Sequence, residues 1–141
     1  MKKLFPLLLL LSLNTAGFAQ KKSPIDGNWI LVEKNGQKLN FQSPQFKSFN
    51  QGYYSIIIMK KEDGSFQSAY AGPFEVNGKQ YFETFKYGSN PKWFGWKGQQ
   101  EWSMKGDTLI MVGHKKVWDP EGKELPGTTW GQFVDKWVRV K

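Results

Sequence analysis

The sequence contains no cysteine and only one histidine, His114, and these shortages exclude much of the chemistry that proteins perform. Without cysteine there is no disulfide to restrict the unfolded chain, so stability must come from packing and backbone hydrogen bonds. A zinc-type site needs several His, Cys or carboxylate ligands, so we expect no metal site. One histidine is enough to hold a haem iron, but a lone histidine is more often an ordinary hydrogen-bonded residue, and we predict no cofactor.

The motifs of nucleophilic catalysis and phosphate binding are also missing. The chain has neither a Gly-x-Ser-x-Gly motif nor a glycine-rich phosphate loop. Glu83 and Glu101 would form a carboxylate pair only if both faced inward, and the alternation of Glu101 with Trp102 predicts that it faces solvent. We therefore expect that the protein is not an enzyme.

Acidic residues are too few to balance the lysines, and the formal net charge is +8, or +6 without Lys2 and Lys3. The lysines are scattered rather than gathered in runs, so we do not expect a nucleic-acid partner. The excess positive charge favours attraction to anionic glycans, lipopolysaccharide or acidic ligands, or it serves solubility alone.

Long apolar runs are absent except near the start, where residues 4–13 follow a basic N-terminus. This run is well short of the roughly 20 residues that span a bilayer, so we expect no membrane span. Gly17 and Ala19 occupy the positions that a signal peptidase reads, which predicts cleavage before Gln20. No cysteine follows the run, so we expect no lipid anchor. The predicted division is a signal peptide at 1–19 and one domain at 20–141, located in the periplasm or secreted.

The rest of the chain alternates short strand-like runs with turn signals, and no stretch keeps a 3.6-residue apolar period. Asn77-Gly78 is the strongest hairpin signal. Residues 35–52 form a long early loop that either holds a short helix or acts as a lid. We predict an all-β fold with little helix, a single antiparallel up-and-down β-barrel of about eight strands, with a sandwich as the alternative. The predicted strand runs are 25–34, 53–60, 66–71, 74–76, 79–87, 98–105, 108–115 and 133–140.

The two ends of this domain carry a family resemblance. Gly27 and Trp29 form a Gly-x-Trp motif in the first run, and Trp137 and Arg139 form a Trp-x-Arg motif in the last. On these residues the chain resembles small exported bacterial lipocalin-like domains, many of them uncharacterised. It departs from lipocalins proper because it has no cysteine pair and no room for their C-terminal helix. The resemblance implies a barrel that binds a small apolar molecule, with an arginine packed over the first-strand tryptophan.

Arg139 is the only arginine beside nineteen lysines, which agrees with that structural role. A planar guanidinium can stack on an indole face and still donate hydrogen bonds, and lysine cannot do both. Gly27 would let the backbone pass closely and Trp29 would plug the barrel end. The alternative is that Arg139 is a surface charge on an edge.

Alternation places many large side chains on one face of their strands, which we expect to point into the barrel. They line an apolar cavity with a few polar groups, or they simply fill a small barrel. His114 shares a face with Ile110 and Val112, which makes it a possible cavity residue. The aligned sets are Tyr81, Glu83, Phe85 and Tyr87, then Phe66 and Tyr70, and then Trp102 and Met104.

The loop at 88–97 is the most unusual segment, because Trp93, Phe94 and Trp96 lie within four residues of each other. A solvated turn does not explain them. They form a lid over the barrel mouth, an exposed contact surface or a tucked loop that covers core. The same three alternatives apply to Trp118 and Trp130, which lie in the last long loop.

Two hypotheses follow. The first is an exported lipocalin-like module that binds a small, largely apolar ligand in the barrel. The second is a non-catalytic interaction protein with a filled barrel, whose aromatic loops contact a protein or glycan partner. The predicted ligand-binding residues are Phe66, Tyr70, Tyr81, Glu83, Phe85, Tyr87, Trp93, Trp96, Trp102, Met104 and His114.

Overall fold

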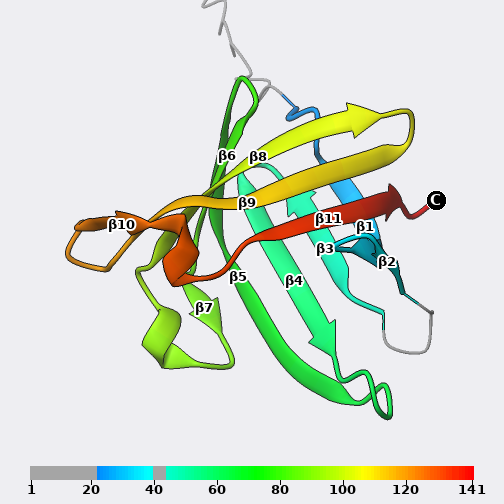
Figure 1. The fold of residues 1–141 in the computed structure, drawn as a ribbon, viewed down its shortest axis with the longest axis horizontal. Coiled ribbons are helices and arrows are strands. Elements are labelled where there is room, and N and C mark those ends of the chain that lie inside the picture. Colours follow the sequence, from blue (N-terminus) through cyan, green and yellow to red (C-terminus); the bar gives the residue numbers. More distant parts are fainter. Residues whose placement is uncertain (1–21, 40–43) are drawn as a thin grey trace, which may run out of the picture.

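Eight antiparallel strands close into a β-barrel in the computed structural model, which describes residues 22–39 and 44–141 (Figure 1). The predicted signal peptide and its cleavage site lie outside the described residues. The barrel strands are β1 (Gly27–Lys34), β3 (Phe46–Asn50), β4 (Tyr53–Met59), β5 (Phe66–Asn77), β6 (Gln80–Thr84), β8 (Lys97–Lys105), β9 (Thr108–Trp118) and β11 (Phe133–Arg139).

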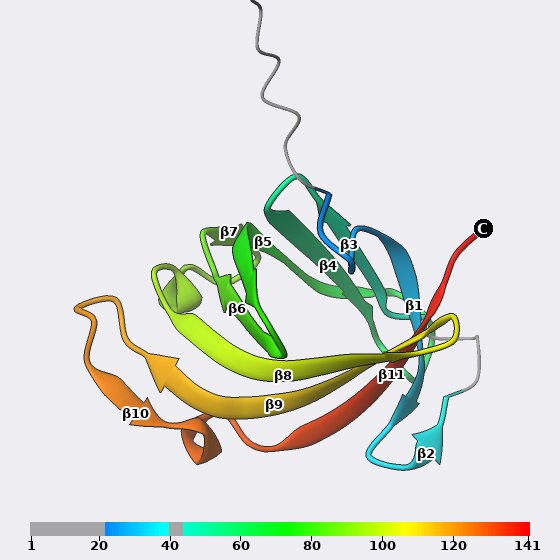
Figure 2. The same ribbon diagram turned by 90° about the horizontal axis from the view of Figure 1, so that it is seen from above.

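Each barrel strand pairs with the next one along the chain, and β1 pairs with β11 to close the ring (Figure 2). This is the up-and-down topology, so the predicted fold class is confirmed. Three short strands add to the sheet outside the barrel path, and two single-turn 3₁₀ helices are the only helices among the described residues. These elements are β2 (Gln37–Lys38), β7 (Tyr87–Gly88), β10 (Glu124–Pro126), η1 (Pro91–Trp93) and η2 (Gly127–Thr129).

Strand β3 lies inside the segment predicted to be a loop, so the prediction for residues 35–52 was wrong. The inward positions of β3 are Lys47 and Phe49, while Phe46 is exposed. A lysine on the inner face and an aromatic on the outer face reverse the usual polarity of a half-buried strand. For this reason the alternation of apolar and polar residues did not predict this strand.

Strand β5 runs without a break through Gly72 and Pro73, where two separate strands were predicted. Its first part pairs with β4 as far as Pro73, and its last part, from Phe74, pairs with β6. Pro73 lies where β5 changes its pairing partner from β4 to β6. Because proline has no N–H to donate to a neighbouring strand, this is a position at which a strand tolerates it. A Cβ at Gly72 would overlap the backbone of Thr84, so this glycine allows a close approach of two backbones. The correct total of eight thus arose from one missed strand and one strand counted twice.

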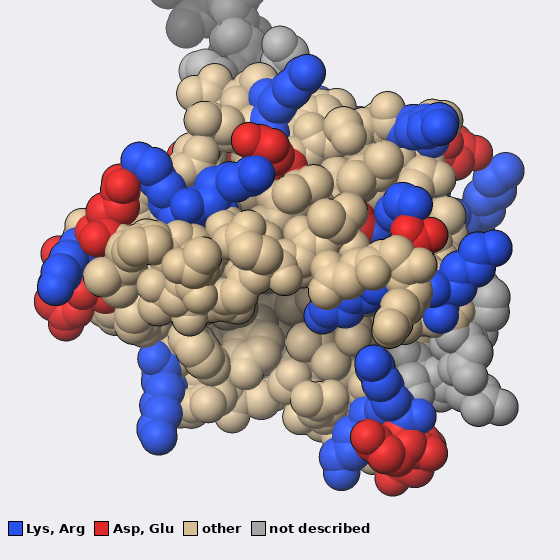
Figure 3. Space-filling view, in the orientation of Figure 1, with Lys and Arg blue, Asp and Glu red and all other residues tan. Residues whose placement is uncertain are grey.

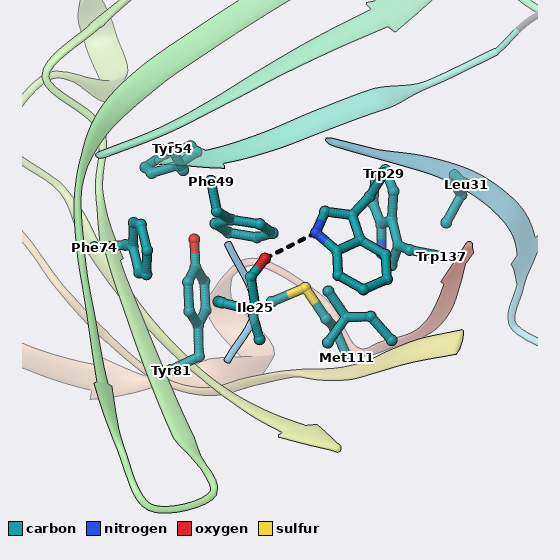
Figure 4. Packing of buried hydrophobic residues seen from close by; sticks show 10 residues of the cluster. Ile25, Trp29, Leu31, Phe49, Tyr54, Phe74, Tyr81, Met111 and Trp137 are labelled. Atoms are coloured by element: carbon teal, nitrogen blue, oxygen red, sulfur yellow. Dashed lines mark hydrogen bonds between the residues drawn. The ribbon is translucent and has the colours of Figure 1, made fainter. Parts of the chain in front are cut away.

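The hydrophobic core fills one end of the barrel, hereafter the closed end (Figure 4). Phe49 packs edge-on against Phe74 and Tyr81, with ring centroids 5.2 and 5.6 Å apart. The buried hydrophobic cluster comprises Ile25, Trp29, Leu31, Phe49, Tyr54, Phe74, Tyr81, Leu109, Met111 and Trp137.

Candidate functional site

The opposite end of the barrel, hereafter the open end, contains a cavity of about 400 Å³. The face shown in Figure 3 is hollowed below β11, and most atoms around the hollow belong to residues that are neither acidic nor basic. This volume is near the lower limit of the range of roughly 300–1,000 Å³ that small-molecule sites occupy. The cavity is lined by Ile56, Ile58, Tyr70, Glu83, Phe85, Trp93, His114, Thr129 and Trp130.

Trp130 joins the aromatic walls of this cavity. Its ring centroid lies 5.3 Å from Phe85, 5.5 Å from Trp93 and 5.0 Å from His114, and all three contacts are edge-to-face. Trp96 packs behind them at 5.6 Å. Perpendicular rings hold one another in place, because the positive edge of one ring meets the negative face of the next. The aromatic loop and the segment after η2 therefore form one wall.

A local irregularity of the sheet places His114 on this wall. The pairing of β8 with β9 shifts between Gln99 and Gln100, so that Gln99 faces Lys116 and Gln100 faces Gly113. The extra residues of β9 form a bulge, which redirects side chains. His114 consequently lies inside with the buried face of β9, and its predicted partners Ile110 and Val112 alternate with buried residues and face the other way.

The one acidic residue on the cavity wall is Glu83, and it is buried. Lys47 Nζ lies 2.8 Å from Glu83 Oε2, and the Tyr81 hydroxyl donates to the same oxygen over 2.7 Å. Gln100 Nε2 donates to Oε1 over 2.9 Å. Lys47 Nζ also lies 5.1–5.4 Å from the ring centroids of Phe49, Tyr54 and Tyr81. The ion pair is thus held between the aromatic core and the cavity.

These contacts set the ionisation of the polar layer. Burial by itself would raise the pKa of Glu83, but the charge and hydrogen bond of Lys47, with the hydrogen bond of Tyr81, hold it below its ordinary value. Burial, and secondarily the negative charge of Glu83, raise the pKa values of Tyr54 and Tyr81. At neutral pH Glu83 is therefore ionised, while Tyr54 and Tyr81 are protonated.

His114 is neutral at the same pH. Burial lowers its pKa more than the nearby Glu83 carboxylate raises it. Among the described atoms, His114 Nδ1 and Trp130 Nε1 have no hydrogen-bond partner, and neither does the buried hydroxyl of Tyr54. Unpaired polar atoms are unusual in a finished core, and two of these, on His114 and Trp130, belong to residues that line the cavity.

A further buried acid, Asp135, faces the barrel interior from β11. Burial raises its pKa from an ordinary 3.8 to about 6, against the opposing effect of Lys34 and Lys47. Its Oδ1 has no partner among the described atoms. Sequence reasoning missed this residue because a single aspartate between Val134 and Lys136 has no distinguishing pattern.

The structure brings five of the eleven predicted ligand-binding residues to the cavity wall: Tyr70, Glu83, Phe85, Trp93 and His114. Trp96 supports the wall from behind, and Tyr81 lies in the core next to Glu83.

Four predicted residues do not line the cavity, and these assignments were wrong. Phe66 is 56% exposed at the far end of β5, and Tyr87 is 54% exposed. Strand β6 ends at Thr84, and Tyr87 belongs to β7, which pairs with β5, so the alternation that begins at Tyr81 does not extend to it. Trp102 and Met104 share the parity of the inward Gln100, but β8 carries them away from the cavity to the closed end. There the Trp102 indole donates to the Gly78 carbonyl and Met104 is 38% exposed.

Several residues of the site gave no sequence signal. Lys47 lay in the segment predicted to be a loop. Gln100 is a common polar residue, and only the position of its strand in the barrel shows that it meets Glu83. Trp130 was predicted to be part of a lid, a contact surface or a tucked loop, and it was not among the assigned ligand-binding residues. The sequence-based assignment also left out Tyr54, Ile56, Ile58 and Thr129.

At the closed end, Arg139 covers Trp29. The guanidinium carbon lies 4.3 Å from the indole centroid, and Nη1 donates to the Asp26 carbonyl over 2.7 Å. The Trp29 indole is fully buried and donates to the Ile25 carbonyl over 2.8 Å (Figure 4). A Cβ at Gly27 would overlap the guanidinium, and the φ of +137° at this residue also requires glycine. This geometry is that of a plug, and it differs from an edge surface charge.

A second, larger and more polar hollow of about 960 Å³ lies outside this plug, between the segment before β1 and the turn from β3 to β4. Lys22, the first residue that the structure describes, is one of the residues that line it. It has no aromatic wall of its own beyond Phe49 and Phe74, and no function is assigned to it.

Over the described ranges, no three His, Cys, Asp or Glu side chains come together as a metal site would require. The described part of the chain also contains no helix that is long and apolar enough to cross a membrane. The chain matches no known family model, no curated protein and no solved structure.

Proposed function

We propose that this barrel is a lipocalin-like module that binds a small, largely apolar ligand in the cavity at its open end. The observation that carries the proposal is the cavity itself, about 400 Å³ walled by aromatic and aliphatic side chains around one buried carboxylate. Largely apolar pockets with a few placed polar groups are typical of small-molecule sites. Together with the signal peptide predicted at 1–19, the proposal places this activity in the periplasm or outside the cell.

The proposed role is binding without catalysis. Glu83 is held by three donors and its charge is balanced by Lys47, so it is a positioned acceptor rather than a base awaiting a proton. Unpaired polar atoms beside the cavity support a site that a ligand completes.

The experiment uses the protein's own tryptophans as reporters. A neutral probe such as 2-naphthol should change the fluorescence with a saturable curve at micromolar concentration, which corresponds to about −8 kcal/mol. Trp93→Phe and Trp130→Phe should remove most of this change, because both indoles line the cavity.

Trp118→Phe is the matched control, since Trp118 packs against Phe82 and Lys97 away from the cavity. Equal signals in all three variants would place binding elsewhere. If a broad panel of apolar probes gives no saturable signal with folded protein, the proposal fails. The exposed Trp93 and Phe94 would then be tested as a contact surface for a protein or glycan.

A further inference from the structure

Glu83, which lines the cavity, has hydrogen-bonding capacity left. An ionised carboxylate offers about four lone-pair positions. Among the described residues three donors reach it: Lys47 and Tyr81 at Oε2, and Gln100 at Oε1. Oε1 therefore accepts from one donor where it has room for two, and Glu83 is also one of the residues that line the cavity.

The charge beside this position is already balanced. Lys47 Nζ lies 2.8 Å from Glu83 Oε2 and is itself buried. A cationic ligand at Oε1 would lie close to this ammonium group in a setting of low dielectric, and an anionic ligand would meet the carboxylate directly. An uncharged donor avoids both costs. Burial on the same wall lowers the pKa of His114, which agrees with an environment that disfavours a further positive charge.

The shape of the walls favours a flat ligand. Ile56 and Ile58 come from β4, while Phe85, Trp93 and Trp130 form the aromatic wall of perpendicular rings. A planar ring system can lie on one ring face and meet the edges of the others, which is the arrangement that aromatic pairs prefer. A cavity of about 400 Å³ holds roughly two or three fused rings.

From these contacts we propose that the ligand is a flat, uncharged aromatic compound whose hydroxyl or N–H group points inward and donates to Glu83 Oε1. This inference rests on the proposed function and adds the ligand's chemical class. Phenolic and indole-like compounds have the required donor, whereas an ionised fatty acid has none.

The test compares three ligands of one shape on the wild-type protein: 2-naphthol, 2-methylnaphthalene and 2-naphthoate. The methyl group replaces the hydroxyl at similar volume and is more hydrophobic, so simple partition would favour 2-methylnaphthalene. We expect 2-naphthol to bind about tenfold more tightly, because a hydrogen bond to a charged acceptor is stronger than a neutral one. The 2-naphthoate anion should bind most weakly.

A double variant, Lys47→Met with Glu83→Gln, sharpens this test. Removing both charges together leaves no buried ion without its partner, which a single substitution would do. The preference for 2-naphthol should fall to about two- or threefold, and the affinity for 2-methylnaphthalene should change little. Near-ultraviolet circular dichroism checks that the variant is folded.

The outcomes separate the two proposals. Folded wild-type protein that binds none of these three ligands and no probe of the broad apolar panel would overturn the proposed function itself. Equal binding of 2-naphthol and 2-methylnaphthalene would leave the binding cavity in place and overturn the hydroxyl-to-Glu83 assignment. Tighter binding of 2-naphthoate would overturn the assignment of an uncharged ligand, and an unchanged preference in the folded double variant would place the acceptor at another residue.

Discussion

The two ends of the barrel are both rich in tryptophan, yet they use it in opposite ways. At the closed end, Trp29 is fully buried, its N–H is paired and Arg139 lies flat on its face. At the open end, Trp93 is 37% exposed and the N–H of Trp130 has no partner among the described atoms. The closed end thus keeps Trp29 fully buried, while the open end leaves part of its aromatic surface exposed.

This difference shows that an aromatic residue cannot be assigned to core or to site from its type alone. What decides is how completely neighbours fill the space around it, since Trp137 belongs to the core although its N–H has no partner among the described atoms. A polar layer of buried charged residues, Lys47, Glu83 and Asp135, faces the barrel interior. The predictions below test each of these regions.

The largest effect is expected from truncating the plug. Trp29→Ala should lower the free energy of unfolding by about 3–5 kcal/mol, because it opens a cavity in a closely packed core. Trp93→Ala is the matched substitution at the open end and should cost about 1 kcal/mol or less, since a third of this side chain is already exposed. Chemical denaturation of both variants measures the difference. Equal losses of unfolding free energy would contradict the view that one end is packed core and the other is a binding site.

The next effect concerns the polar layer. Because the folded state raises the pKa of Asp135 from 3.8 to about 6, the folded protein holds this proton more tightly than the unfolded chain does. Ionisation of Asp135 therefore costs stability as the pH rises through this window, and the cost is complete above about pH 7. Asp135→Asn should stabilise the protein at pH 8 by up to about 3 kcal/mol, and this gain should vanish below about pH 3.

Denaturant midpoints at the two pH values measure that effect. Asp107→Asn is the control, because Asp107 is exposed and its replacement should change stability by less than about 0.5 kcal/mol. If Asp135→Asn destabilises the protein at pH 8, the carboxylate makes favourable contacts that outweigh its burial.

The smallest effect tests the cover of the plug. Arg139→Lys keeps the charge but removes the planar group that stacks on Trp29 while donating to the Asp26 carbonyl. We expect a loss of about 1–2 kcal/mol, against no more than about 0.5 kcal/mol for Lys141→Ala on the exposed last residue. If the unfolding curves of Arg139→Lys and wild type coincide, the stacking of Arg139 on Trp29 contributes nothing to stability, and Arg139 acts only as a surface charge.

Local patterns were enough to predict the barrel class. Strand-like runs with turns between them, the absence of helical periodicity and the lack of cysteine all favoured a closed antiparallel barrel. Adjacent hairpins also predicted the order of pairing, because an up-and-down sheet joins neighbours in sequence. Alternation from Glu83 to Phe85 pointed to two residues that line the cavity, although β6 ends between them at Thr84.

The site itself depended on contacts between distant segments. Lys47 meets Glu83 across 36 positions of the chain, and no local pattern links a lysine in an apparent loop to a glutamate in a strand. A bulge in β9 turned His114 inward, and the direction of β8 carried Trp102 and Met104 to the wrong end for binding. Sequence determines which residues share a strand face, because alternation is local. Only the closed tertiary structure decides which end of the barrel each residue reaches and which buried charge it meets.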